Sequence, residues 1–204
     1  IDYMCKNGIE LDSITTNGSL LDSEMSRKLL KYPWRMFMFS VDAATKEVYE
    51  SIRQGLNYEK VTENIRTFLR MRRDLGHSQA QVRLNMVIYE KNQHQEEEFY
   101  NMWKEHLLQG KDDIAFLYAT DFGGLANIQY SKDIKSRSIR IPCGRLWNNL
   151  ILVSVTGDIV LCCGDYEADN NIGNIFREDS IKKPWNNAKM QMFRNMHLKD
   201  DFAS

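Results

Sequence analysis

The sequence predicts an α/β protein in which parallel βα units are followed by a small unit made of a β-hairpin and a helix. Apolar segments of strand length alternate with amphipathic helical segments over residues 1–118, which is typical of a parallel sheet with right-handed crossovers. The alternation stops at Phe122, where Gly123-Gly124 and the basic run Lys132–Arg140 are typical of a loop. We therefore expect one unit at residues 1–121, a linker at 122–141 and a second unit at 142–204.

The elements of the first unit follow from its hydrophobic pattern. Arg35–Val41 is a continuous apolar run of the kind found in buried parallel strands. Tyr58–Leu75 is the clearest helix, because apolar residues recur every three to four positions and Gly76 follows. Along the chain we expect the last turn of a helix at Ile1–Lys6, strands at Ile9–Ile14, Arg35–Val41, Gln81–Ile88 and Ile114–Tyr118, and helices at Leu20–Leu30, Tyr58–Leu75 and Gln93–Leu108.

The second unit is predicted from a hairpin bounded by cysteines. Arg145–Thr156 is expected to be a strand, Gly157-Asp158 a turn, and Ile159–Leu161 the returning strand. Cys143 and Cys162 flank this hairpin with the spacing Cys-x13-Gly-x4-Cys. A hairpin brings its ends together, so thiolates distant in the sequence can face one metal centre. A final amphipathic helix is expected at Pro184–Met196.

Composition excludes several classes of protein. The net charge of −1 over 204 residues gives no electrostatic basis for binding nucleic acid or an anionic membrane. There is no apolar run near the roughly 18 residues that a membrane-spanning helix needs. The four unevenly spaced cysteines are unlike a secreted disulfide framework, so we expect a reducing, cytoplasmic setting. The chain opens at Ile1 with no signal-peptide pattern, and we expect it to be a piece of a longer protein.

Four motifs in a fixed order carry a resemblance to a known family. Thr15-Thr-Asn-Gly18, Phe39-Ser-Val-Asp-Ala43, Tyr49-Glu-Ser-Ile-Arg53 and the cysteine hairpin together resemble the C-terminal part of a radical S-adenosylmethionine (SAM) enzyme with a SPASM-type auxiliary iron–sulfur domain. The resemblance implies that the first unit is the second half of a partial (β/α)6 TIM-like barrel. It also implies that the second unit is a truncated auxiliary domain for one or two 4Fe–4S clusters. The family's Cys-x3-Cys-x2-Cys and Gly-Gly-Glu motifs are absent from this sequence, in which Cys5 stands alone.

The resemblance also implies a SAM site at the carboxyl ends of the strands, where ligands of parallel sheets bind. The implied contacts are made by Thr16, Asn17, Ser40, Arg53, Asn85 and Val87. From the residues alone, Thr15–Gly18 is better explained as a turn with a helix cap, and Val87 as a core residue. A solvated helix-end arginine explains Arg53 equally well. Asp42 is expected to cap the turn that follows its strand.

Cys143 and Cys162 are the expected cluster ligands, with Cys163 as a third candidate. Two neighbouring residues of a regular strand point to opposite faces, so Cys163 is expected to bind the cluster only if the strand has ended before it. Buried, inert cysteines and a zinc site are the alternatives, although zinc usually takes Cys-x2-Cys pairs. Asp165 and Tyr166 are expected to shape the turn. None of the four histidines has a ligand partner at suitable spacing.

The resemblance implies a function for the parent protein. Such enzymes reductively cleave SAM to a 5′-deoxyadenosyl radical that abstracts hydrogen from a small molecule, a sugar or a peptide. The auxiliary cluster accepts an electron or holds the substrate, and flavodoxin or ferredoxin is the expected redox partner. A non-catalytic module that binds a metal or a partner on a barrel-like scaffold is the alternative. The strand at Ile9–Ile14 would leave an open edge, so we also expect self-association through it.

Overall fold

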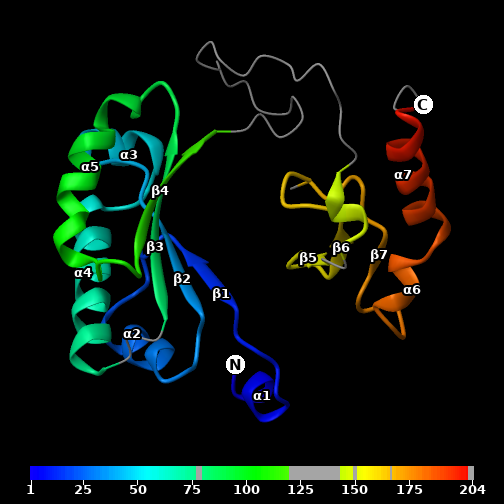
Figure 1. Cartoon of the computed structure of the whole chain (residues 1–204), viewed down its shortest axis with the longest axis horizontal. Coiled ribbons are helices and arrows are strands. Elements are labelled where there is room, and N and C mark those ends of the chain that lie inside the picture. The colour runs from blue at the N-terminus through cyan, green and yellow to red at the C-terminus, as the bar shows by residue number, and fades with distance from the viewer. Residues whose placement is uncertain (77–79, 120–142, 149–150, 166, 202–204) are drawn as a thin grey trace. The chain divides into compact units, whose positions relative to one another are not determined.

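The computed structural model describes residues 1–76, 80–119, 143–148, 151–165 and 167–201. These residues form two compact units, the first containing residues 1–119 and the second the described residues from 143 onward (Figure 1). The predicted linker at 122–141 lies outside the described residues, so the expected unit boundaries stay a prediction. No helix in the described part of the chain combines the length and the apolar character that crossing a membrane requires.

The first unit contains a parallel sheet of four strands in the order β1-β2-β3-β4. Its strands are β1 (Ser13–Thr16), β2 (Met36–Ser40), β3 (Gln81–Ile88) and β4 (Asp113–Tyr118). The sequential parallel order confirms the predicted fold class. The strand expected at Ile9–Ile14 is wrong in its bounds, because Ser13 is the first residue that pairs with β2, opposite Met36.

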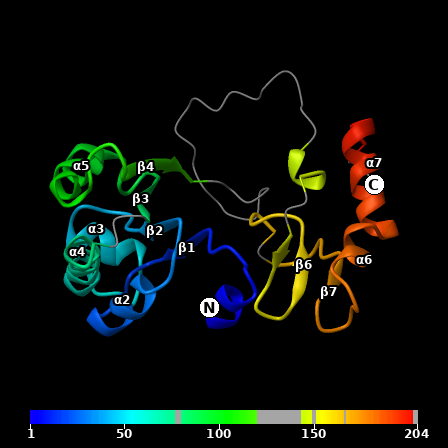
Figure 2. The same ribbon diagram turned by 60° about the horizontal axis from the view of Figure 1, so that its bottom comes forward.

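Helices of the first unit cover one face of this sheet (Figures 1 and 2). They are α2 (Ser23–Leu30), α3 (Lys46–Ile52), α4 (Tyr58–Asp74) and α5 (Glu96–Trp103), and a short α1 (Asp2–Lys6) precedes β1. The helix expected at Gln93–Leu108 is α5 with a 3-10 turn at each end, η1 (Gln93–Gln95) and η2 (Lys104–His106), because helix termini often tighten in this way. The seven-residue α3 was not predicted, since so short a segment shows little periodicity.

The core lies between the sheet and these helices. Phe37 and Phe39 of β2 contact Phe68 of α4 with ring centroids 4.8 and 5.2 Å apart. In β3 every second residue from Val82 to Ile88 is buried. Because side chains alternate along a strand, the intervening residues lie on the opposite face. We call this the open face, and its members on the two central strands include Met38, Ser40, Arg83, Asn85 and Val87.

The second unit contains the predicted hairpin, followed by a strand and two helices. β5 (Leu152–Val153) and β6 (Asp158–Val160) pair antiparallel, and β7 (Gly173–Asn174) adds to β6. The 3-10 turn η3 (Gly144–Leu146) precedes them, and α6 (Lys182–Trp185) and α7 (Ala188–Lys199) follow. One small core joins η3, β6, the residue before β7, and α7, and it consists of Leu146, Ile159, Ile172 and Met190.

Two expectations for the second unit need correction, and one strand was not predicted. In the described part of the strand expected at Arg145–Thr156, only β5 pairs, because Gly144 to Asn148 form a hydrogen-bonded turn whose residues are not β-branched. The two-residue β7 was not predicted. The helix expected at Pro184–Met196 is two helices, since Asn187 caps a new one by accepting a hydrogen bond from the Met190 N–H at 2.9 Å.

Candidate functional sites

Ser40, at the carboxyl end of β2, lies side by side with Asn85 of the neighbouring strand β3. They are register partners in β2 and β3 and both lie on the open face. The side-chain oxygen of Asn85 is buried and accepts no hydrogen bond from any described residue. A buried acceptor without a donor is costly in a folded protein. The pair therefore offers polar groups to a ligand at the edge of the sheet where parallel α/β folds bind ligands.

Thr16 and Asn17 build the turn after β1. The Thr16 hydroxyl accepts a hydrogen bond from the Gly18 N–H at 3.1 Å, and the Asn17 side chain accepts from the N–H and hydroxyl of Ser19 at 3.0 and 2.8 Å. Gly18 has φ +76°, and a Cβ there would lie 3.0 Å from a side-chain carbon of Ile65. The contacts of these two side chains therefore agree with the interpretation of Thr15–Gly18 as a turn with a helix cap.

Thr15, rather than Thr16, shares the open face. Thr15 pairs with Met38 of the open face, whereas Thr16 pairs with Phe39 of the core. Thr15 is exposed. Sequence reasoning missed this residue, although the alternation of side chains along a strand would have selected it once the strand bounds were known.

Asp42 does not cap the following turn, contrary to expectation. Its side chain is 4% exposed and contacts Arg53 at the end of α3, with the Arg53 Nε and Nη2 atoms 2.6 and 2.5 Å from Oδ2. Its other oxygen accepts a hydrogen bond from the Val87 N–H at 3.0 Å. Arg53 is therefore not simply a solvated helix-end arginine, since a buried carboxylate fixes one edge of its guanidinium.

Asn92 extends this network to the loop after β3. Its side-chain amide donates to the carbonyls of Asp42 and Val87, both at 2.7 Å, and its oxygen accepts from the Tyr89 N–H at 2.9 Å. Both backbone groups of Val87 are thus occupied within the protein, so only its side chain can contact a ligand. Burial, followed by the charge of Asp42, raises the pKa of Tyr89 to about 12, against an opposing effect of Arg53.

Cys143 is held beside α7 in the second unit. Its N–H donates to the Nδ1 atom of His197 at 3.4 Å, and Arg194 donates to the Leu146 carbonyl at 2.9 Å. Both contacts come from α7 and fix the turn that follows Cys143. His197 lies next to a candidate cluster ligand, a placement that its position in the sequence did not indicate.

Cys162 and Cys163 lie just beyond β6, which ends at Val160. The condition under which Cys163 was expected to serve as a ligand is therefore met. Asp165 shapes this turn as expected, because its carboxylate accepts from the backbone N–H groups of Asp169 and Asn170, both at 3.1 Å. The prediction for Tyr166 falls outside the described residues.

The donor chemistry of the second unit fits an iron–sulfur cluster. Cys143, Cys162 and Cys163 are free thiols, and thiolates are the ligands that such clusters use. The segments that carry them share one core, through Leu146 on one side and Ile159 on the other. Among the described residues, however, no three His, Cys, Asp or Glu side chains are grouped as a metal site. The ligand set therefore stays a prediction.

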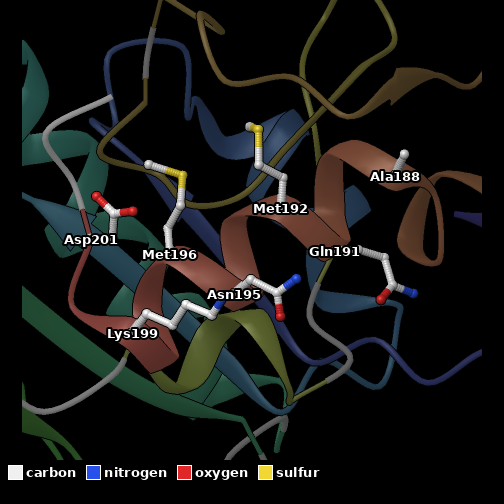
Figure 3. A pocket seen from close by; sticks show the side chains of 7 residues that line it. All are labelled: Ala188, Gln191, Met192, Asn195, Met196, Lys199 and Asp201. Atoms are coloured by element: carbon white, nitrogen blue, oxygen red, sulfur yellow. The ribbon is translucent and has the colours of Figure 1, made fainter.

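A separate hollow of about 610 Å³ follows α7 (Figure 3). Met192 and Met196 point the same way along it, and the remaining lining residues are Ala188, Gln191, Asn195, Lys199 and Asp201. No cysteine lines this hollow. It is therefore distinct from the cysteine-bearing segments.

Comparison with known proteins identifies the second unit. Residues 143–203 match the family model of SPASM, an iron–sulfur cluster-binding domain. The predicted SPASM resemblance is confirmed. The match begins at Cys143 and includes Cys162 and Cys163. No curated protein matches the chain in sequence.

Two solved structures are similar in fold to this chain. Streptococcus suis SuiB bound to its precursor peptide SuiA is 14% identical, with a TM-score of 0.64 over 89% of this chain and 49% of that one. SuiB bound to S-adenosylmethionine is 13% identical, with a TM-score of 0.58 over 90% and 50%. The chain thus spans about half the length of SuiB. These likenesses show that the chain shares the fold of the matched part of SuiB.

Proposed function

We propose that this chain is the cluster-binding and cofactor-facing part of a radical SAM enzyme. The observation that carries the proposal is the SPASM match at residues 143–203, in a chain that also contains a parallel sheet with the fold of SuiB. In such an enzyme SAM supplies the radical that abstracts hydrogen from the substrate. The residues of this chain bind and orient the cofactor and hold the auxiliary cluster.

The proposed SAM site lies at the carboxyl ends of the strands. Ser40 and Asn85 are adjacent there on the open face, and Arg53 reaches the same end of the sheet through its contact with Asp42 after β2. Val87 contributes its side chain, because its backbone groups are occupied. Thr16 and Asn17 shape the loop through which the cofactor would be approached.

The proposed auxiliary 4Fe–4S cluster is bound by Cys143 and Cys162, with Cys163 as a further ligand. The support is the family match that includes all three and the accessibility of the Cys143 and Cys163 residues. The cluster would accept an electron from the substrate or hold the substrate in place. Because thiolate ligands must be reduced, we also propose a cytoplasmic setting, in keeping with the four free thiols.

A peptide is the substrate class with the most support, since the related SuiB was crystallised with its precursor peptide. A small molecule or a sugar is the other class. We propose flavodoxin or ferredoxin as the electron donor. The substrate and the electron donor are proposed for the whole enzyme. The matched SuiB chain is about twice as long as this one.

Anaerobic reconstitution with iron and sulfide tests the cluster. The wild-type chain should turn brown and show a broad thiolate-to-iron absorption at roughly 400 nm. The double variant Cys143→Ala/Cys162→Ala should lose most of this absorption and of its bound iron. Cys5→Ala is the matched control, because Cys5 is an exposed free thiol of the other unit. A colourless wild type, or equal loss in the control, would contradict the proposal.

A further inference from the structure

Asp42 occupies the junction of β2, β3 and the end of α3. Its two carboxylate oxygens are both in use, one by the guanidinium of Arg53 and the other by the backbone N–H of Val87. Its carbonyl accepts a hydrogen bond from Asn92 at 2.7 Å. Side chain and backbone are therefore fixed from three directions, and the carboxylate cannot swing to follow Arg53.

The surroundings of this carboxylate make its ion pair strong. The Asp42 side chain is 4% exposed, and charge-assisted hydrogen bonds strengthen as the local dielectric falls. Tyr49, also buried, has a hydroxyl with no hydrogen-bond partner among the described residues, and burial raises its pKa. Tyr49 therefore adds no charge beside the Asp42–Arg53 pair at neutral pH.

Arg53 keeps part of its guanidinium available. A guanidinium has five N–H donors in a rigid planar fork, and Asp42 contacts only the edge formed by Nε and Nη2. No described residue accepts a hydrogen bond from Nη1. The side chain is 33% exposed, so the outer edge formed by Nη1 and Nη2 is open to a ligand. That edge has the geometry to bind a carboxylate with two hydrogen bonds.

We propose that Asp42 is a positioning residue that holds Arg53 with its outer edge presented to the carboxylate of the methionine part of SAM. The inference rests on the proposed SAM site and adds how one of its groups is oriented. Asp42 touches no ligand in this arrangement. Asp42 neutralises much of the Arg53 charge, so binding of the SAM carboxylate depends on the orientation of the guanidinium fork. An arginine that rotates freely would not present that fork in a fixed orientation.

Two ligands separate this role from a general structural one. SAM carries the amino-acid carboxylate, whereas 5′-methylthioadenosine keeps the adenosine and the sulfur but lacks that part. Ligand-observed NMR titration of the whole chain measures both affinities even when they are weak. Asp42→Asn should weaken SAM binding about tenfold, corresponding to about 1.4 kcal/mol, and leave 5′-methylthioadenosine binding unchanged. Unchanged affinity for 5′-methylthioadenosine also shows that the site of the variant is folded.

An Arg53→Gln background and a second ion pair complete the test. If Asp42 acts through Arg53, Asp42→Asn should have no further effect on SAM affinity once Arg53 is Gln. Asp113→Asn is the matched control, since it breaks the Arg83–Asp113 pair at the other end of the strands. Equal weakening of both ligands by Asp42→Asn, or of neither, would overturn the role of Asp42. A wild type that binds neither ligand would overturn the proposed SAM site itself and this role with it.

Discussion

The buried pair of Arg72 and Asp112 gives the sharpest prediction about stability. Their side chains are 1% and 0% exposed. Asp112 accepts two hydrogen bonds from the Arg72 guanidinium and one each from the N–H groups of Val82 and Leu108, at 2.9 and 2.8 Å. Asp112→Asn has one acceptor oxygen for these four donors and leaves a cation buried without its counter-charge. We expect a loss of about 3–5 kcal/mol in the free energy of unfolding.

Urea unfolding followed by circular dichroism measures this loss. Asp113→Asn is the control, because the neighbouring Arg83–Asp113 pair has side chains 36% and 40% exposed and should contribute only about 0–1 kcal/mol. The two variants make the same chemical change one residue apart. A loss for Asp112→Asn no greater than that for Asp113→Asn would refute the reasoning.

The same pair predicts a pH dependence. Burial alone would raise the pKa of Asp112, but the hydrogen bonds from Arg72, Leu108 and Val82 outweigh it, so the folded-state pKa is lowered. A group with a lowered folded-state pKa stabilises the protein fully above its unfolded pKa, about 3.9, and loses that contribution as the pH falls through the folded value. The stability difference between the wild type and Asp112→Asn should therefore be constant near neutral pH and shrink only in acid below about pH 4.

Two further predictions concern the hairpin and the sheet edge. Gly157→Ala should destabilise the second unit by roughly 1–2 kcal/mol, because Gly157 has φ +85° and a Cβ there would lie 2.5 Å from the Phe176 ring. Thermal unfolding checks this against Gly144→Ala, whose Cβ would meet no atom within 4 Å, and equal effects would contradict it. β1 is an edge strand of the first sheet, and we expect the chain to self-associate through it. Light scattering should show a mass that rises with concentration, whereas a clean monomer of native-like stability would argue against an open edge.

The sequence predicted best those elements whose pattern is long and regular. β3 was placed at its observed bounds, because polar and apolar residues alternate from Gln81 to Met86 and the apolar run continues to Ile88. α4 was placed within one residue, since its apolar stripe spans more than four turns. The second unit was harder, because strands of two residues such as β5 and β7 contain no detectable period.

Site residues could likewise be predicted where a regular local pattern places them, and not where contacts distant in the sequence place them. Strand parity placed Asn85 and Val87 on the same face of β3, whereas the pairing of Ser40 with Asn85 depends on a register that only the fold reveals. The role of Asp42 could not be predicted, since its partners Arg53 and Val87 are 11 and 45 residues away in the sequence. Arg72 fitted the apolar stripe of its helix by spacing, and only the fold reveals that Asp112 balances its charge.

Iron K-edge X-ray absorption of the reconstituted chain tests the central claim most directly, since it identifies the atoms bound to iron. Thiolate ligation by Cys143 and Cys162 in a 4Fe–4S cluster predicts a first shell of sulfur and a second shell of iron. Both should be lost in the Cys143→Ala/Cys162→Ala variant. A first shell of oxygen or nitrogen, or a sulfur shell unchanged in that variant, would contradict the assignment of the second unit as an iron–sulfur domain held by these cysteines.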